Sequence, residues 1–573
     1  MRSFANVCRL LALLTVVSQT CFAQTGQARQ NAAQLILRQI KPELKSIEGA
    51  AQIKCGTSLV AWAHIHWREL STLDKRDIAR ALQRPARQKD RLSPSGKFRV
   101  HYDTTGVDAP ALISAGPSAQ RIDNTCEQYV DSVARFFDNA WAVEVETMGY
   151  SPPPQDGEQG GGPEYDVYIE DLGAGNFGQT AWEPSDVVEE GPRQRFATYI
   201  TIDNDYLGLR TPGMDGLKIT AAHEFQHAIQ VGAYGIWNTV PNSDFYIYEI
   251  TSVWMEHVLY PSIHDYYLDL PAYFHRFRDL QDRSFSFTIY EPPTYAGYER
   301  SIWAHFLAKR FGPDVMRDIW EGMKADPFLQ SMSRVLQRHG STIESEFSLF
   351  SYWNFFTGDR ADPVRYYEEG AWYPRYLPNA TVAYSGLTAE ITTSGFPLST
   401  QFYQFSIPND TLIAVVANVD ANLAGEGSLT ATSFGLTLTS GRVKPPYQKL
   451  AKGYVAGFSS DRSNAWRVLY LESATRSNAS AAPEASPNPL RLSKDAKLSL
   501  PIPGAASGEA HIYMFSSSLD LVFSEVYPVV ESFGNKVITI PAEALRLRIP
   551  SGVYFVIARC GDQEFKWKVA ILR

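Results

Sequence analysis

A five-residue motif, His223-Glu224-Phe225-Gln226-His227, combines residue types that suit metal-assisted hydrolysis. On an α-helix, residues four apart leave the same face about 6 Å apart along the axis, so both imidazoles can bind one zinc ion. Glu224, one step round the helix, is then placed to act as general base on a zinc-activated water. The alternative is a pair of histidines on an ordinary core helix. The motif predicts a catalytic metal site.

A catalytic zinc ion needs a third protein ligand, and two carboxylates follow the motif. Glu249 and Glu256 are seven residues apart, so they share one face of a predicted second helix. We expect Glu249 to bind the metal, while the other carboxylate holds a ligand histidine from behind. The alternative is that Glu249 is a solvated helix carboxylate.

With these residues in place, the chain resembles the gluzincin metallopeptidases, in which H-E-x-x-H is followed by a helix carrying a glutamate ligand. In aminopeptidase-like gluzincins that helix reads N-E-G-x-A-x-x-x-E, and residues 250–252 replace its small G-x-A stretch here. The resemblance implies an antiparallel edge strand that pairs with substrate backbone beside the zinc helix. We assign this edge strand to the alternating segment Phe196–Asp203, with a second strand over Tyr165–Glu170.

The resemblance also implies a donor to the developing oxyanion. Tyr298 takes the position of the tyrosine in the Y-x-K-G-x helix start of aminopeptidase-like gluzincins, with Tyr295 as a nearby competitor. A half-buried core tyrosine is the alternative for either residue. His257 and His305 lack ligand spacing and are interpreted as structural. A predicted strand over Phe98–Tyr102 opens the catalytic domain. Its order with the tandem prolines at 152–154, Tyr165–Tyr168 and the histidine motif is similar to a group of exported bacterial metallopeptidases, over roughly residues 50 to 380.

Length, charge and the first residues place this site in an exported, multidomain chain. The chain has 573 residues and a net charge of −9, with no basic tract of the kind that binds nucleic acid. Arg2 and Arg9 precede an apolar run over residues 10–17, and a cleavage site after Ala23 fits a signal peptide. No later run reaches the length of a transmembrane helix. We therefore expect a secreted protein, extracellular or attached to the cell surface.

Three of the five cysteines remain after signal cleavage. Because an exported protein meets oxidising conditions, a disulfide between Cys55 and Cys126 is the default expectation, with Cys560 unpaired. A sharper hypothesis is that Cys55 binds the zinc ion in a latent precursor, since a thiolate is a good zinc ligand.

The chain divides by composition and periodicity into six segments, with a fold class of multidomain α+β. After the signal peptide, 1–23, a helical segment over 24–95 suits a propeptide, and its basic end at 84–91 would be accessible to a trypsin-like protease. A thermolysin-like (zincin) metallopeptidase domain follows over 96–378. Two all-β sandwich domains cover 379–476 and 486–573, and a linker at 477–485 joins them.

The last segment carries a second resemblance. Its start at Ser486-Pro487-Asn488-Pro489, the G-x-Y at Gly552-Val553-Tyr554 and the basic end of the chain resemble the carboxy-terminal sorting domain of type IX secretion substrates. The alternative is one more immunoglobulin-like sandwich. The resemblance implies that the type IX secretion machinery is a partner.

Two functions from different classes follow from these patterns. The first is a secreted zinc metallopeptidase that cleaves protein or peptide substrates with one zinc ion, Glu224 acting as general base and then as acid. An endopeptidase is favoured, because no G-x-M-E-N segment precedes the zinc helix. The second is a cell-surface adhesin or binding protein on a catalytically silent zincin scaffold. Asp203-Asn204-Asp205 is a weak candidate for a calcium site.

Overall fold

The computed structural model has a mixed α+β architecture in two compact units that divide after Glu472. The predicted signal peptide, the first part of the N-terminal segment and the predicted linker at 477–485 lie outside the described residues. The structure describes the chain from Lys54 to Arg573 except for residues 66, 117, 174, 238–244, 277–296, 385–387, 408–409, 422–431, 441–447, 450–453, 461–464, 473–489, 494, 496, 503–507, 517–520, 533–534, 547 and 561–562.

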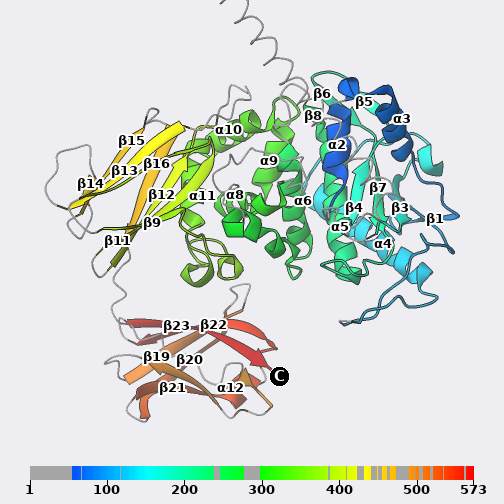
Figure 1. Cartoon of the computed structure of the whole chain (residues 1–573). Helices are drawn as coiled ribbons and strands as arrows, with labels where there is room; N and C mark the ends of the chain where they lie inside the picture. The colour runs from blue at the N-terminus through cyan, green and yellow to red at the C-terminus, as the bar shows by residue number, and fades with distance from the viewer. Residues whose placement is uncertain are drawn as a thin grey trace, which may run out of the picture. The chain divides into compact units, whose positions relative to one another are not determined.

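A five-stranded sheet supports the first part of unit 1 (Figure 1). Its strands, in spatial order, are β1 (Lys89–Leu92), β2 (Phe98–Tyr102), β3 (Tyr165–Glu170), β7 (Tyr199–Asp203) and β4 (Gly178–Ala181). The three middle strands are parallel, and the two outer strands run antiparallel to their neighbours. The predicted strands over β2 and β3 are confirmed. The strand expected within Phe196–Asp203 is present as β7, but its expected edge position is wrong, because β7 pairs on both sides and β4 lies outside it.

Helices α4 (Cys126–Ala140) and α5 (Gly213–Ile229) pack against this sheet and each other. The central residue of the histidine motif anchors α5, because the Phe225 ring lies 5.3 Å from the Phe98 ring of β2 and 5.6 Å from the Trp141 ring. Aromatic pairs at such distances stabilise a core beyond simple burial. The motif is thereby fixed to the sheet.

Further helices follow on the far side of α5 from the sheet. They are α6 (Phe245–Leu259), α8 (Ile302–Phe311), α9 (Asp314–Gly322), α10 (Phe328–Arg338) and α11 (Ile343–Trp353). The predicted helices that carry the histidine motif and Glu249 are confirmed by α5 and α6. Helix α6 packs on α5 and on α8. Two helices that carry predicted ligands are therefore in direct contact. Within the described part of the chain, no helix is both long and apolar enough to cross a membrane.

The segment expected to be helical and removable is only partly so. Helices α2 (Thr57–Ile65) and α3 (Thr72–Ala81) are present, but Lys89–Leu92 forms strand β1. Arg84 lies 2.7 Å from carboxylates of both Asp156 and Asp166, and Arg87 pairs with the carboxylates of Asp103, Asp108 and Glu170. These ion pairs hold both arginines in place, while Lys89 is exposed, and protease access to the stretch 84–91 stays a prediction.

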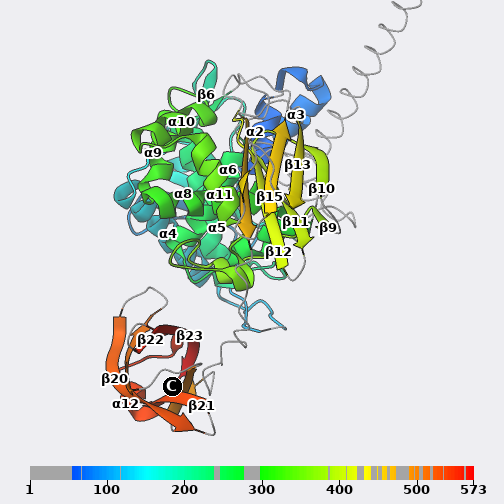
Figure 2. The same cartoon turned by 90° about the vertical axis from the view of Figure 1, so that its left-hand side faces the viewer.

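The β-strands that follow form two four-stranded sheets facing each other within unit 1 (Figure 2). The first contains β9 (Ala380–Ala383), β11 (Ser399–Ile407), β12 (Asp410–Asn418) and β16 (Trp466–Glu472). The second contains β10 (Thr388–Gly395), β13 (Thr432–Ser440), β14 (Gln448–Lys449) and β15 (Tyr454–Ser460).

The first of these sheets belongs to two hydrophobic cores. Phe402 and Val415, cross-strand partners on β11 and β12, join the core of the helical region, where α11 contacts β12. Their neighbours Tyr403 and Ala414 join the core between the two sheets. This follows from strand geometry, because successive side chains point to opposite faces.

Unit 2 has its own hydrophobic core and a seven-stranded sheet. The two separate sheets expected of a sandwich are joined, because β20 pairs with β19 along its first part and with β21 at its end. The elements are β17 (Leu490–Arg491), β18 (Lys497–Ile502), β19 (Gly508–Phe515), β20 (Leu521–Ser532), β21 (Asn535–Pro541), α12 (Ala542–Arg546), β22 (Gly552–Cys560) and β23 (Gln563–Leu572).

Candidate metal centre

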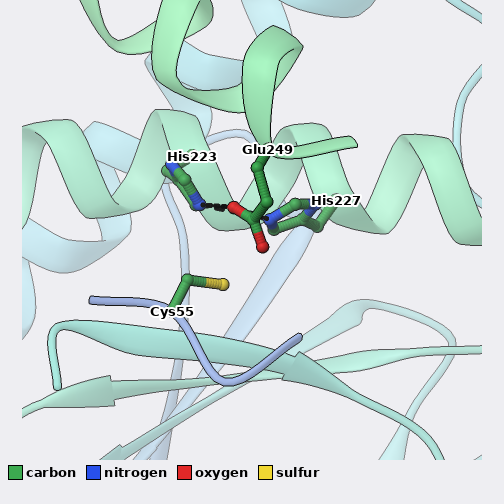
Figure 3. A group of neighbouring side chains, drawn as sticks. All are labelled: Cys55, His223, His227 and Glu249. Atoms are coloured by element: carbon green, nitrogen blue, oxygen red, sulfur yellow. Dashed lines mark hydrogen bonds and ion pairs between the residues drawn. The ribbon is translucent and has the colours of Figure 1, made fainter. Parts of the chain in front are cut away.

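Helices α5 and α6 bring the three predicted metal ligands together in the interior of unit 1 (Figure 3). His223 Nε2 lies 3.1 Å from His227 Nε2. Oε2 of Glu249 lies 3.2 Å from the first nitrogen and 3.4 Å from the second. All three side chains are buried. Glu249 stands 22 positions after His227 and thus reaches the two histidines from a neighbouring helix.

The two histidines and Glu249 have the donor atoms that a zinc ion needs, and one feature of the structure supports a cation between them. Glu249 Oε2 is buried without a hydrogen-bond partner, although it faces two imidazole nitrogens. A buried, unsatisfied carboxylate oxygen costs free energy, and a cation bound to it removes that cost. Two imidazoles and a carboxylate are a common ligand set of catalytic zinc.

The other side of each histidine ring is held in place. His223 Nδ1 lies 2.7 Å from Glu256 Oε1, and His227 Nδ1 lies 2.7 Å from Gln230 Oε1. Such partners fix the ring orientation and leave both Nε2 atoms for the metal. Glu256 thus takes the supporting position expected of the second carboxylate. Gln230 was not predicted, although a glutamine three residues after a ligand histidine on a buried helix was the available signal.

The charged side chains of the triad shift one another's pKa values. Burial alone would lower the pKa of His223, but the carboxylates of Glu249 and Glu256 beside its two ring nitrogens raise that pKa to about 9. Burial opposes ionisation of Glu249, yet the adjacent His227 and His223 hold its pKa well below the usual range. The carboxylate is therefore ionised and ready to ligate a metal.

Glu224, the predicted general base, is buried next to the triad and is hydrogen-bonded through one oxygen. Its Oε2 accepts from the Thr180 hydroxyl of β4 at 2.9 Å and from the Thr57 hydroxyl at 3.1 Å. The carboxylate therefore has a fixed position beside edge strand β4. Its partner Thr57 comes from the N-terminal segment.

Tyr298 begins the 3₁₀ turn (Tyr298–Arg300) that leads into α8, and its ring centroid lies 6.2 Å from that of His223. Its hydroxyl oxygen accepts the backbone N–H of Cys55 at 3.2 Å. Burial and the nearby charges of Glu249, Cys55 and Glu224 raise the pKa of Tyr298 well above its usual value, so the hydroxyl keeps its proton. The competing candidate Tyr295 lies outside the described residues.

Cys55 is the fourth member of the cluster, and the expected disulfide with Cys126 is wrong. Cys55, Cys126 and Cys560 are all free. Four potential ligand atoms lie within 4.8 Å of one another, one each from Cys55, His223, His227 and Glu249. Figure 3 shows the Cys55 thiol pointing toward the other three side chains. Burial and the charges of Glu224 and Glu249 raise the pKa of the Cys55 thiol well above its usual value. A bound cation reverses this, because a coordinating thiol is deprotonated.

Lys54, which was not singled out from the sequence, closes the site behind Glu256. Its buried Nζ donates to both oxygens of Glu256 and, at 2.7 Å, to Asp265. Asp265 is in turn 2.6 Å from Arg210. Burial alone would lower the pKa of Lys54, but Asp265 and Glu256 raise it above its usual value. The charges supporting His223 are thereby balanced inside the protein.

The weak calcium candidate is not assembled in the structure. Asp203 accepts backbone N–H groups of Leu172, Asp205 and Tyr206, and Asp205 pairs with Arg121. Burial, with a contribution from the Asp205 charge, raises the pKa of Asp203 to about 7 despite these hydrogen bonds. These carboxylates already serve the turn after β7, so they do not converge on a cation.

A second group of ligand types lies away from the triad. His257, expected to be structural, lies 3.5 Å from Glu369, and His264 lies 3.4 Å from the same carboxylate. Tyr266 already donates to that carboxylate, and the rings of His257 and His305 lie 5.2 Å apart. These contacts and its partial exposure make the group a weaker metal site than the buried triad.

No protein-family model matches the chain, and a search of curated proteins found no match either.

Proposed function

We propose that this chain is a zinc-dependent metallopeptidase that hydrolyses peptide bonds as an endopeptidase. The observation that carries the proposal is the convergence of His223, His227 and Glu249 on one buried point, with an unsatisfied Glu249 oxygen facing it. Glu224 lies next to this point, and in the sequence it stands between the two ligand histidines. A purely structural metal site has no need of a general base there.

Each residue of the site has a definite role in the proposed reaction. When bound, zinc supplies Lewis acidity, which polarises a carbonyl group and makes water acidic near neutral pH. Glu224 accepts the proton of the attacking water and delivers it to the leaving amine. Tyr298, whose raised pKa keeps it protonated, donates to the oxyanion that develops on the carbonyl oxygen.

Edge strand β4 supports a peptide as the substrate class. The outer side of β4 can hydrogen-bond a further extended segment, as its contacts with the backbone of Lys54 and Gly56 illustrate. Thr180 of β4 donates to Glu224, so a backbone aligned on β4 lies beside the general base. The proposed substrate is therefore an extended segment of a protein or peptide.

The second candidate is a binding protein with a silent, closed metal site, and the position of Cys55 favours it. Four protein ligands, which His223, His227, Glu249 and Cys55 would provide, are typical of structural zinc. In that case the chain binds surfaces through its β-sheet regions. The two candidates differ in whether peptide is cleaved once Cys55 is removed.

The test uses Cys55→Ser protein, in which the fourth ligand is absent, loaded with one equivalent of zinc. We expect it to cleave unfolded casein, and we expect Glu224→Gln in the same background to retain zinc but lose at least about 10²-fold in rate. Glu146→Gln, an exposed position on a neighbouring segment, is the matched control. If zinc-loaded Cys55→Ser protein fails to cleave casein, the peptidase proposal is wrong and the binding protein stands.

We further propose that unit 2 directs export as a type IX sorting domain. Its separate hydrophobic core supports a part that folds by itself. The mature protein would then act outside the cell or attached to its surface.

A further inference from the structure

We propose that residues Lys54–Ser58, here called the blocking segment, hold the site in a latent state with Cys55 as a displaceable fourth metal ligand. The inference rests on the proposed peptidase function. It concerns five consecutive residues, each of which is engaged at the metal centre or at the strand beside it.

Cys55 lies where a metal ion held by the triad would otherwise meet solvent or substrate. Its Sγ belongs to the four ligand atoms that lie within 4.8 Å of one another. The backbone N–H of Thr57 points at the same sulfur at 3.4 Å, at the start of helix α2. A catalytic zinc site keeps its fourth position open, and here the Cys55 sulfur would close it.

The backbone of the blocking segment occupies the free edge of the sheet. Gly56 N–H donates to the Gly178 carbonyl of β4 at 3.1 Å, and Phe177 N–H donates to the Lys54 carbonyl at 2.9 Å. Cys55 and Gly178 form a parallel bridge. The segment therefore takes the position in which a substrate backbone would add to β4.

The side chains of the blocking segment engage the supporting and catalytic carboxylates. Lys54 binds Glu256, Thr57 donates to Glu224 at 3.1 Å, and Ser58 donates to Glu249. The amide of Cys55 also uses the Tyr298 hydroxyl. The general base, the oxyanion donor and a metal ligand are thus all engaged by one stretch of chain. Peptide cannot reach any of them until this stretch leaves.

Gly56 gives a way to displace the segment without touching a metal ligand. A Cβ atom at this position would lie 3.0 Å from the Cβ of Gln179 and 2.5 Å from its Oε1. The first contact is with the root of a side chain on β4, which rotation of Gln179 cannot relieve. Gly56→Val therefore pushes the segment off the edge, while Cys55→Ser removes the fourth ligand.

The first experiment examines ligation without reference to activity. Cobalt(II) is loaded into the full chain in place of zinc, and its absorption spectrum is recorded. We expect a thiolate-to-cobalt charge-transfer band in the wild type and in Cys126→Ser, the matched cysteine control, and its loss in Cys55→Ser. A wild-type spectrum without that band would overturn the assignment of Cys55 as a ligand.

The second experiment measures access to the metal. An N-acyl dipeptide hydroxamate is titrated into zinc-loaded wild type, Cys55→Ser, Gly56→Val and Cys126→Ser by calorimetry. The apparent affinity for the hydroxamate is lower when fewer molecules are open. We therefore expect Cys55→Ser and Gly56→Val to bind it at least about 10-fold tighter than wild type and Cys126→Ser do. Equal affinity in all four folded proteins would overturn the blocking role. Circular dichroism and zinc content establish that each variant is folded and loaded.

Casein cleavage by the same proteins separates the two proposals. Faster cleavage by Cys55→Ser and Gly56→Val than by wild type supports both. Tighter hydroxamate binding without cleavage by any variant refutes the peptidase function and leaves the blocking segment intact. Equal, rapid cleavage by wild type and variants upholds the peptidase and refutes the latency.

Discussion

Lys54 and Glu256, 202 positions apart in the sequence, form a buried ion pair in which the ammonium nitrogen lies 2.6 and 2.7 Å from the two carboxylate oxygens. The pair connects the blocking segment to the residue that holds His223. Removal of one partner of a buried pair leaves the other charge unpaired and costs about 3–5 kcal/mol. We expect Lys54→Met to lower the free energy of unfolding by that amount.

Chemical denaturation of unit 1 measures this loss. Lys218→Met is the matched control, because its pair with Asp215 is on the surface, where such pairs contribute about 0–1 kcal/mol. A Lys54→Met protein as stable as the control would show that Glu256 and Asp265 find adequate partners without the ammonium group.

Glu249 and Glu256 should differ in their effect on metal affinity. Loss of a supporting residue behind a ligand typically weakens binding 10–100-fold, so we expect Glu256→Gln to fall within about that range. Glu249→Gln, which removes a ligand charge, should weaken binding further. Zinc competition with a chromophoric chelator measures both, with Glu321→Gln as a distant control. The reverse ranking would mean that the two carboxylates exchange roles.

Tyr298→Phe should slow peptide cleavage roughly 10–10³-fold in the Cys55→Ser background, because the oxyanion loses a hydrogen-bond donor. The reduction should be in kcat rather than in zinc content. Tyr150→Phe removes the hydroxyl of another buried tyrosine, one without a hydrogen-bond partner, and should have no such effect. If Tyr298→Phe retains full activity and Tyr295→Phe does not, the donor is Tyr295.

Glu144 predicts a pH dependence of stability that is separate from the metal centre. It is fully buried in the turn Trp141–Thr147, both its carboxylate oxygens lack a hydrogen-bond partner, and burial raises its pKa well above the usual value. The folded state therefore binds a proton that the unfolded state releases above its ordinary pKa of about 4.3. This contribution to stability is present below that pH and is lost as the pH rises.

Glu144→Gln removes the ionisable group and should raise the melting temperature of unit 1 at pH 8. The difference from wild type should shrink as the pH falls toward 4–5, near the usual glutamate pKa. Thermal melts of wild type, Glu144→Gln and the exposed control Glu146→Gln across this range provide the check. A pH-independent difference would show that the carboxyl group is not protonated on folding.

Deletion of unit 2 should separate catalysis from export. Without residues 473–573, the Cys55→Ser protein should keep its zinc and its rate of casein cleavage, because unit 2 has its own core. In a native host the truncated protein should accumulate in the periplasm, and unit 2 fused to an inert exported reporter should carry it out. A truncated protein that still leaves the cell would refute the sorting role.

The sequence predicts those parts of the site that lie within one helix or in strongly patterned segments. The spacing of His223 and His227 specifies a shared helix face, and the seven-residue step from Glu249 to Glu256 places the second carboxylate behind a ligand. Strands β2 and β3 are rich in β-branched and aromatic residues, which marks them before folding.

Features that depend on contacts between distant segments were missed or misjudged. Edge strand β4 consists of Gly178–Ala181, whose composition carries no strand signal, and only pairing with β7 makes it a strand. The pairing of Lys54 with Glu256 spans 202 positions, so no local pattern indicates it. A disulfide was expected for Cys55 because export favours oxidation, but its tertiary position places it at the metal ligands instead.

The sheet that contains β11 and β12 has a consequence for how this protein can be shortened or recombined. Phe402 on one face contacts the rings of Phe355 and Tyr376, whereas Tyr403 on the other contacts Phe434 of the facing sheet. A chain ending near residue 378 would leave the first set of aromatic rings in water, and an isolated 379–476 fragment would do the same from the other side. The two predicted domains therefore share one hydrophobic core and should fold as one piece. A chain that ends after Glu472 keeps this core whole.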